Sequence, residues 1–188
     1  RRGTGNAVGN LSNLVTVPNN LLQGNIKEAG VNTLRFAINT TVGILGIFDP
    51  AAAMGFEKKE KEDYGQTFGS WGVGPGCYLV LPILGPSTVR DTVGTVATFV
   101  GGDPWYNVTT RNDTNYFKES DYYSTRITGG IDYRAKNIES FDSLENNSID
   151  FYASIRSLYL QDRQQKILNS KKITDTMDDS DWEEIESN

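Results

Sequence analysis

Two apolar segments, each interrupted by glycine or proline, constrain the fold of this chain most strongly. The first covers residues 42–48, stops at Asp49-Pro50 and resumes over residues 51–56; the second covers residues 78–84. Neither reaches the ~18–20 uninterrupted apolar residues that a membrane-spanning helix needs, and glycine and proline disfavour regular helix or strand. Two interpretations follow: loops packed as core beneath helices, or a surface that contacts lipid acyl chains.

Most of the remaining pattern is helical. Residues 26–41 and residues 121–144 both carry apolar side chains with helical spacing. These side chains are Val31, Leu34 and Ile38 in the first segment and Ile127, Ile131, Ala135 and Ile138 in the second.

A further helix is expected over residues 149–168. Ser148 is the expected N-cap, and Asp150 lies in the first turn, where the helix dipole favours a carboxylate. Tyr152, Ile155 and Tyr159 then share one face of this helix.

The other segments predict little regular structure. Residues 1–25 indicate turns and short helix, and residues 64–86 indicate a loop with a short extended piece. A short helix is expected over residues 91–99, followed by loops or short helices to residue 120. Because no two alternating runs are joined by a hairpin turn, the predicted fold class is all-α, in one domain over residues 1–168.

The acidic charge is concentrated at the C-terminus. Residues 174–188 hold seven acidic side chains and no Lys or Arg, and without them the net charge of −6 becomes +1. Such a block predicts a solvated, flexible tail over residues 169–188, with docking onto a basic partner as the alternative. The nearly neutral body argues against nucleic-acid binding.

The residue inventory narrows the possible chemistry. The chain has no histidine and one cysteine, Cys77, which excludes internal disulfides, Cys/His zinc clusters and histidine-based acid–base catalysis. Cys77 is expected to be a small semi-buried apolar residue. The stretch Gly72-Val-Gly74-Pro-Gly76 lacks the Gly-Lys-Ser/Thr ending of a phosphate loop, so no nucleotide is expected. We expect no metal, no cofactor and no enzymatic activity.

A binding role for an amphiphile is compatible with these features. Glycines flank the apolar segments, Tyr78 begins the second of them, and Arg90 and Asp91 follow it closely. Together they provide a path with one apolar and one polar side, which suits a molecule whose acyl chains and headgroup need different surroundings.

Four motifs follow one another along the chain: Leu22-Gln-Gly24, RFAINTTVGILGIFDPA over residues 35–51, YGQTFG over 64–69, and WGVGPGCYLVLPILGPSTVRD over 71–91. In this order they resemble the MlaA/VacJ family of outer-membrane lipoproteins, and the resemblance extends over residues 1–168. Two positions depart from the family pattern: Cys77 stands where proline is usual, and Ala7 where an aromatic residue is common.

The resemblance implies a ring-like helical fold that lies in the outer membrane, encloses an amphipathic channel and sits beside a trimeric porin. It implies that mislocalised phospholipids are taken from the outer leaflet and passed to a soluble periplasmic carrier, without hydrolysis. A signal peptide and a lipid-anchored cysteine are expected upstream of Arg1, on the periplasmic side of the outer membrane.

The resemblance also assigns residues. It assigns a flexible loop to Gly72, Gly74 and Gly76, and a channel border to five residues of the second apolar segment. These are Tyr78, Leu79, Leu81, Ile83 and Leu84.

For other residues two roles stay open. Arg90 and Asp91 are polar lining or a structural ion pair. Ile127, Ile131 and Ile138 are channel wall or ordinary helix packing. Structural hydrogen bonds at helix ends and turns are expected from Arg35, Asn39 and Asp49.

Two rival functions remain open. One is a porin-associated envelope scaffold that transfers no lipid. The other is a phospholipase, against which the missing histidine and the missing nucleophile-elbow motif argue.

Overall fold

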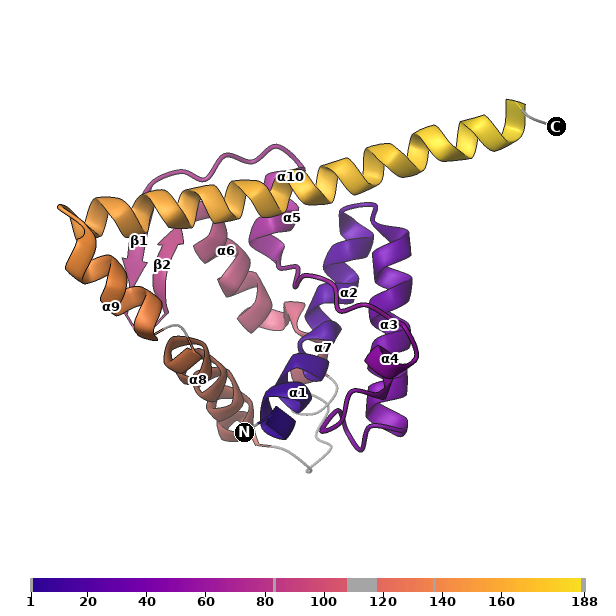
Figure 1. Ribbon diagram of the computed structural model, residues 1–188, viewed down its shortest axis with the longest axis horizontal. Helices are drawn as coiled ribbons and strands as arrows, with labels where there is room; N and C mark the ends of the chain where they lie inside the picture. The colour runs from indigo at the N-terminus through magenta and orange to yellow at the C-terminus, as the bar shows by residue number, and fades with distance from the viewer. Residues whose placement is uncertain (1, 83, 108–117, 137, 187–188) are drawn as a thin grey trace.

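Helices dominate the computed structural model, which describes residues 2–82, 84–107, 118–136 and 138–186 (Figure 1). The first half of the chain forms α1 (Arg2–Leu11), α2 (Asn13–Leu22), α3 (Ile26–Thr41), α4 (Pro50–Ala53) and α5 (Tyr64–Ser70). A hairpin of β1 (Tyr78–Leu81) and β2 (Gly85–Thr88) follows. The chain continues through α6 (Val89–Ala97), the π-helical turn η1 (Thr98–Gly102), α7 (Pro104–Tyr106), α8 (Glu119–Lys136), α9 (Ile138–Asn147) and α10 (Phe151–Glu186).

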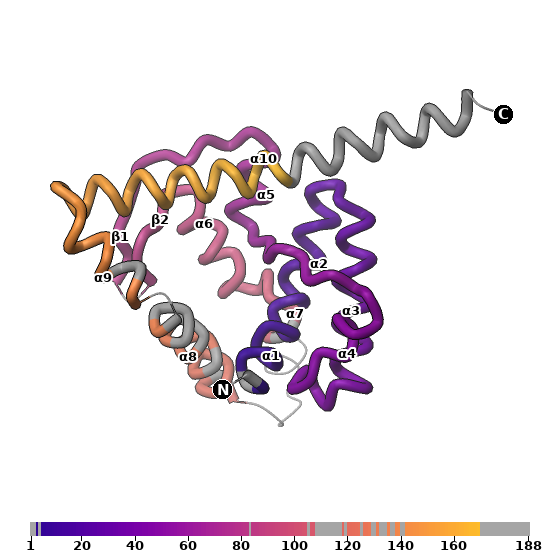
Figure 2. Tube along the Cα trace, in the orientation of Figure 1, coloured from indigo at the N-terminus to yellow at the C-terminus, as the bar shows by residue number. Residues whose placement is uncertain are grey.

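The elements follow a ring-like outline in Figure 1. Helix α10 forms one side and lies against α5 and β2, and α9, α8 and α1 continue the outline (Figure 2). The α2–α3 pair closes it, while α6 packs on α5 and lies inside the outline. Helices far apart in the sequence, α5 and α10, are thereby placed side by side.

Short polar side chains fix the starts of two helices at the centre of the fold. Asp63 accepts a hydrogen bond from the backbone N–H of Gln66 at 2.9 Å and begins α5. The Thr88 hydroxyl accepts one from the N–H of Asp91 at 3.2 Å and begins α6. Each cap satisfies an N–H that the helix itself leaves unpaired.

The start of α10 differs from the prediction. Asp150, rather than Ser148, provides the cap: its Oδ1 accepts from the N–H of Ala153 at 2.9 Å. The Ser148 hydroxyl is buried and has no hydrogen-bond partner among the residues described. Both residues can cap a helix, so composition does not choose between them; the backbone path after α9 does.

The predicted helices are otherwise largely confirmed. Helix α3 has the bounds expected from its spacing, and the helix predicted over residues 91–99 is α6. The pattern over residues 121–144 becomes α8 and α9, while residues 1–25 are more regular than expected and form α1 and α2. Helix α10 continues to Glu186, over most of the predicted tail, whose flexibility stays a prediction.

The loop with a short extended piece predicted over residues 64–86 is only partly right, because the extended piece is β1, whereas α5 and the hairpin were not predicted. Strands β1 and β2 pair antiparallel, with Tyr78 opposite Thr88 and Leu81 opposite Gly85. Each strand has four residues, and β2 reads Gly-Pro-Ser-Thr, which has little intrinsic strand preference. Contacts with α10 supply the support that two short strands lack on their own.

The interior of the protein is mainly polar. Among the side chains that the structure describes, the fully buried ones of largest volume are Asn19, Asn20, Asn25, Asn32, Thr16, Thr67, Thr88 and Asp103. Several pair directly across the packed helices. The Thr67 hydroxyl donates to Asn19 Oδ1 at 2.7 Å, and Asn32 Nδ2 donates to Asn20 Oδ1 at 2.9 Å. These bonds offset the cost of removing amides and hydroxyls from water.

Large apolar side chains, in contrast, lie on the outside. On α3 the buried face consists of Ala29, Asn32, Arg35 and Asn39, while Leu34 of the predicted apolar face is 50% exposed. The periodicity therefore located the helix but not its inward face. Within the described parts of the chain, no helix is both long and apolar enough to cross a membrane.

The core interpretation of residues 42–48 is also wrong. Val42, Ile44, Leu45, Ile47 and Phe48 are all exposed, Leu45 by 70%. In the second segment, Leu79, Val80 and Leu84 are exposed too. Contiguous exposed apolar surface of this kind marks contact with a membrane or a partner.

A pair of glycine substitutions tests the packing of α6 on α5. A Cβ at position 94 would lie 2.4 Å from the backbone N of Gly65, and a backbone cannot be displaced cheaply. We expect Gly94→Ala to lower the free energy of unfolding by about 1–3 kcal/mol.

Gly30 is the matched control, because a Cβ on this α3 glycine would meet nothing within 4 Å. Gly30→Ala is expected to be neutral or to stabilise by up to about 1 kcal/mol through helix propensity. Denaturant unfolding in detergent, followed by circular dichroism, measures both variants. Equal effects of the two substitutions would contradict the close α5–α6 packing.

Candidate functional site

A pocket of about 220 Å³ lies between α5, α6, the hairpin and α10. We call it the amphipathic pocket, because one part of its lining is apolar and another part is charged. Its lining residues are Asp63, Leu81, Leu84, Pro86, Ser87, Asp91, Gly94, Thr95, Thr98, Tyr159 and Arg163.

Arg163 of α10 organises the charged side of the pocket. Its guanidinium donates to both carboxylate oxygens of Asp63, at 2.7 and 2.8 Å. It also donates to both oxygens of Asp91, at 2.8 and 3.2 Å. Arg163 therefore joins the start of α5, the start of α6 and the middle of α10, three elements that are distant in the sequence.

Two further side chains contact the carboxylate of Asp91. Arg90 forms an ion pair with it at 3.0 Å, and the Tyr159 hydroxyl donates to its Oδ2 at 2.8 Å. Burial raises the pKa of Asp91, but the hydrogen bonds and charge of Arg163, together with Tyr159, outweigh burial and hold this pKa below its usual value. The carboxylate stays ionised, and burial together with Asp91 raises the pKa of the Tyr159 hydroxyl.

The hairpin supplies the apolar side of the pocket. Leu81 and Leu84 line it, and Tyr78 fixes the hairpin against α10. The Tyr78 ring packs edge-on against Tyr152 at 5.5 Å and Tyr159 at 6.1 Å between ring centroids. The two tyrosines of α10 therefore share one face, as predicted. Such edge-to-face pairs stabilise by about 0.5–1.5 kcal/mol beyond area burial.

The structure brings some of the predicted site residues together. Leu81, Leu84 and Asp91 line the amphipathic pocket. Arg90 lies behind Asp91 and forms the structural ion pair that was one of its two expected roles. Ile83 lies outside the described residues.

Other predicted residues lie away from this pocket. Gly72, Gly74 and Gly76 belong to an exposed loop before β1, and Gly72 and Gly76 adopt φ values of +92° and +68°. A glycine is required there because L side chains rarely adopt such angles. The flexibility of this loop stays a prediction. Leu79 does not line the pocket, and Cys77 is exposed, so its predicted semi-buried position is wrong.

The isoleucines of α8 and α9 also lie outside the pocket. Ile127, Ile131 and Ile138 are exposed by 53%, 65% and 50%. The predicted alternative that these three isoleucines pack against other helices of this chain is therefore wrong. A place in a channel wall stays a prediction.

Sequence reasoning missed the main charged residues of the pocket. Asp63 and Arg163 were not predicted as site residues, although they form its shortest ion pair, at 2.7 Å. The available signal was the spacing of Tyr159 and Arg163, four residues apart and therefore on one face of α10. The missing information was the contact of that face with α5 and α6, 72 residues away for Asp91.

The structural roles assigned to Arg35, Asn39 and Asp49 are confirmed. Arg35 donates to both Asp49 oxygens at 3.0 and 2.8 Å, and Asn39 Nδ2 donates to Asp49 Oδ1 at 2.9 Å. Asp49 also caps α4. The charge and hydrogen bonds of this cluster outweigh the effect of burial and lower the pKa of Asp49.

The site offers paired charges on one side and an apolar surface on the other. Among the residues placed by the structure, no cluster of three His, Cys, Asp or Glu side chains could hold a metal ion. The two carboxylates of the amphipathic pocket, Asp63 and Asp91, are both paired with Arg163. Apolar side chains on the exterior, polar ones in the interior and a two-sided pocket together define a class: a helical protein with an inverted distribution of side chains.

Comparisons with known proteins identify the family. The family described as MlaA lipoprotein matches residues 1–166, and the chain belongs to this family. An uncharacterized protein of Rickettsia bellii is 35% identical over 161 residues, 85% of this chain and 59% of the relative. The intermembrane phospholipid transport system lipoprotein MlaA of Haemophilus influenzae is 32% identical over 91% of this chain and 65% of its own length.

The fold is likewise shared. A solved structure described as "Structural basis for maintenance of bacterial outer membrane lipid asymmetry" matches with a TM-score of 0.70 and 28% identity, over 89% of this chain and 79% of that chain. The lipoprotein MlaA of Escherichia coli K12 is 32% identical over 86% of this chain and 61% of the relative. This chain spans about three fifths of the length of the curated relatives it matches.

Proposed function

We propose that this protein contributes to the lipid asymmetry of the outer membrane by binding phospholipids. In this proposal it lies in the outer membrane, takes mislocalised phospholipids from the outer leaflet and passes them to a soluble periplasmic carrier, beside a trimeric porin. The lipid passes through an amphipathic channel of which the amphipathic pocket forms a part. The protein is a lipoprotein that hydrolyses nothing.

The inverted distribution of side chains carries this proposal. Asparagines, threonines and ion pairs fill the interior, while leucines, isoleucines and valines face outwards. In water each exposed apolar side chain costs about 25 cal/mol per Å² of apolar area, whereas contact with acyl chains removes that cost. A membrane as solvent explains both halves of the distribution at once.

The exposed loop over residues 42–48 has the backbone that lipid contact requires. Most of its N–H groups are satisfied internally: Leu45 donates to Thr40 O, Gly46 to Asn39 O and Phe48 to Gly43 O, at 2.8–3.0 Å. Backbone groups in hydrocarbon find no water to replace such bonds.

The same loop holds strained residues. Ile44 and Leu45 have φ values of 51° and 55°, which are unfavourable for L residues and especially for a β-branched one. Strain of this kind costs about 1–3 kcal/mol per residue and persists where function requires it. Here it turns a row of apolar side chains outwards, in support of a membrane-facing loop.

Filling the amphipathic pocket tests the proposal. Thr95 lines the pocket, and Val96 beside it on α6 is 52% exposed and does not line it. The protein is purified gently from bacterial envelopes, and its phospholipid content is measured by native mass spectrometry with lipid extraction. We expect phospholipid in the wild type and in Val96→Trp, and loss of phospholipid in Thr95→Trp, because the indole occupies lipid space.

Two outcomes would oppose this function. A porin-bound protein without phospholipid, and without any difference between the variants, would favour the envelope scaffold. Release of lysolipid or free fatty acid would favour a phospholipase. Circular dichroism of both variants establishes that a lost lipid does not reflect a lost fold.

A further inference from the structure

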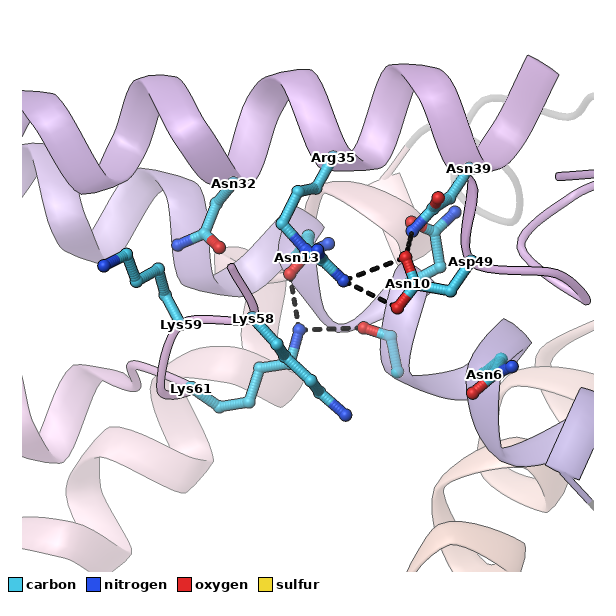
Figure 3. Close-up of a pocket in the computed structure, with 11 residues that line it drawn as sticks. Asn6, Asn10, Asn13, Asn32, Arg35, Asn39, Asp49, Lys58, Lys59 and Lys61 are labelled. Atoms are coloured by element: carbon cyan, nitrogen blue, oxygen red, sulfur yellow. Dashed lines mark hydrogen bonds and ion pairs between the residues drawn. The ribbon is translucent and has the colours of Figure 1, made fainter. Parts of the chain in front are cut away.

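A second pocket, separate from the amphipathic pocket, lies between α1, α2, α3 and the segment after α4 (Figure 3). Its volume is about 30 Å³, and we call it the cationic pocket. It is lined by Asn6, Gly9, Asn10, Asn13, Asn32, Arg35, Asn39, Asp49, Lys58, Lys59 and Lys61.

Positive charge exceeds negative charge in this lining. Arg35 and Asp49 neutralise each other in a two-bond ion pair. Three lysines remain, and no other acidic residue lines the pocket. Lys59 lies 3.7 Å from the exposed Glu57, a contact that water screens, and Lys58 forms no ion pair within the described part of the chain.

Lys61 places its ammonium at the centre of the lining, whereas the Lys58 and Lys59 side chains extend to either side of it (Figure 3). Its ammonium donates to Gly9 O at 2.8 Å and to Asn13 Oδ1, neutral acceptors that leave its charge uncompensated. Burial lowers the pKa of Lys61 to about 8, with further lowering by the charges of Lys58 and Arg35. A nearby anion would remove this repulsion.

The pocket borders the exposed apolar loop. Asn6 Nδ2 donates to Ile47 O at 3.2 Å, and Asp49 directly follows Phe48 in the chain. Amide groups of the lining thus lie beside side chains that face outwards, and the three lysines line the same pocket. A phosphodiester attached to acyl chains matches this arrangement: its oxygens fit a small cationic recess, and its chains continue along an apolar surface.

We propose that the cationic pocket binds the phosphate group of a phospholipid headgroup, with Lys58, Lys59 and Lys61 as the charged contacts. The lipid source of that phosphate rests on the proposed function; the recognition of phosphate does not. The volume admits the phosphate oxygens only, so the pocket holds a headgroup at the surface and encloses no acyl chain.

Calorimetric titration of the purified protein in a phosphate-free detergent tests this site. The ligands are dihexanoyl phosphatidylglycerol, dihexanoylglycerol without phosphate, and inorganic phosphate. We expect Lys58→Gln/Lys59→Gln to raise the Kd for the phospholipid by about tenfold or more, through loss of charge-assisted contacts. Lys27→Gln, which removes one positive charge from an exposed lysine of α3 outside the pocket, leaves that Kd unchanged.

The ligands separate the sources of phosphate. Tighter binding of the phospholipid than of inorganic phosphate supports the headgroup, and equal binding supports a site for free phosphate. Equal affinity of the wild type and the double variant, or equal binding of dihexanoylglycerol and the phospholipid, overturns the site. Co-purified phospholipid is measured in the same samples. We expect the double variant to bind phosphate more weakly and yet to retain this phospholipid, whereas only Thr95→Trp loses it. The two proposals can therefore fail independently.

Discussion

Replacing Arg163 by methionine is expected to lower the free energy of unfolding by about 3 kcal/mol. Arg163 holds two carboxylates, and its removal leaves the carboxylate of Asp91, which is 6% exposed, with Arg90, Tyr159 and Thr88. Breaking a buried ion pair on one side costs about 3–5 kcal/mol. The lower end applies because the Asp63 side chain is 45% exposed and water solvates it. Denaturant unfolding in detergent, followed by circular dichroism, gives the value.

Lys166→Met is the matched control for this prediction. Lys166 lies on the same helix and forms an exposed ion pair with Asp162 at 2.7 Å. Exposed pairs contribute about 0.5 kcal/mol or less, so this variant is expected to remain close to the wild type. If the two variants lost the same small stability, Arg163 would not join α5, α6 and α10 as the structure indicates.

Replacing Glu62 by glutamine is expected to change how stability depends on pH. Glu62 is 7% exposed, and burial raises its pKa from the usual 4.5 to about 7; a hydrogen bond from Gln23 opposes this, and the charges of Asp63, Glu28 and Glu60 add to it. The folded state therefore binds this proton more tightly than the unfolded chain. The resulting stability is present near pH 5 and is lost as pH rises through 7.

The predicted size follows from that shift. Between pH 5 and 7.5 the wild type loses about 2 kcal/mol through Glu62, whereas Glu62→Gln cannot ionise and keeps its stability. Unfolding at several pH values in this window measures the difference. The exposed Glu60→Gln in the same segment, expected to run parallel to the wild type, is the control. If the free energies of unfolding of Glu62→Gln and the wild type differed by the same amount at every pH, the prediction would be contradicted.

Other groups act outside this window. The pKa values of Asp49, Asp63 and Asp91 are lowered, because hydrogen bonds and arginine charge outweigh burial, so their contributions are lost only in acid. The lowered pKa of Lys61 makes the free energy of unfolding rise with pH, opposite to the effect of Glu62, and only above about pH 8. Glu62 consequently dominates near neutrality.

The charged segment over residues 57–62 illustrates a general difficulty for sequence reasoning. Its alternating charges indicate a solvated helix end or loop, and the exposed Glu57 and Glu60 agree with that. The side chains of Glu62 and Lys61 point inwards instead. Glu62 accepts a hydrogen bond from Gln23, and Lys61 donates one to Asn13. These hydrogen-bond partners lie 39 and 48 residues away in the sequence. Because they are so distant, no local pattern predicts which of the charged side chains are buried.

The sequence by itself determined the helical class, the bounds of α3 and the ordered motifs that identify the family. These are local properties, set by spacing and capping over one or a few helical turns. Only the tertiary structure decided which faces point inwards, since helical periodicity assumes water outside and an apolar core, and here the interior is polar. It also decided the site, because Asp63, Asp91 and Arg163 meet only when α5, α6 and α10 pack together.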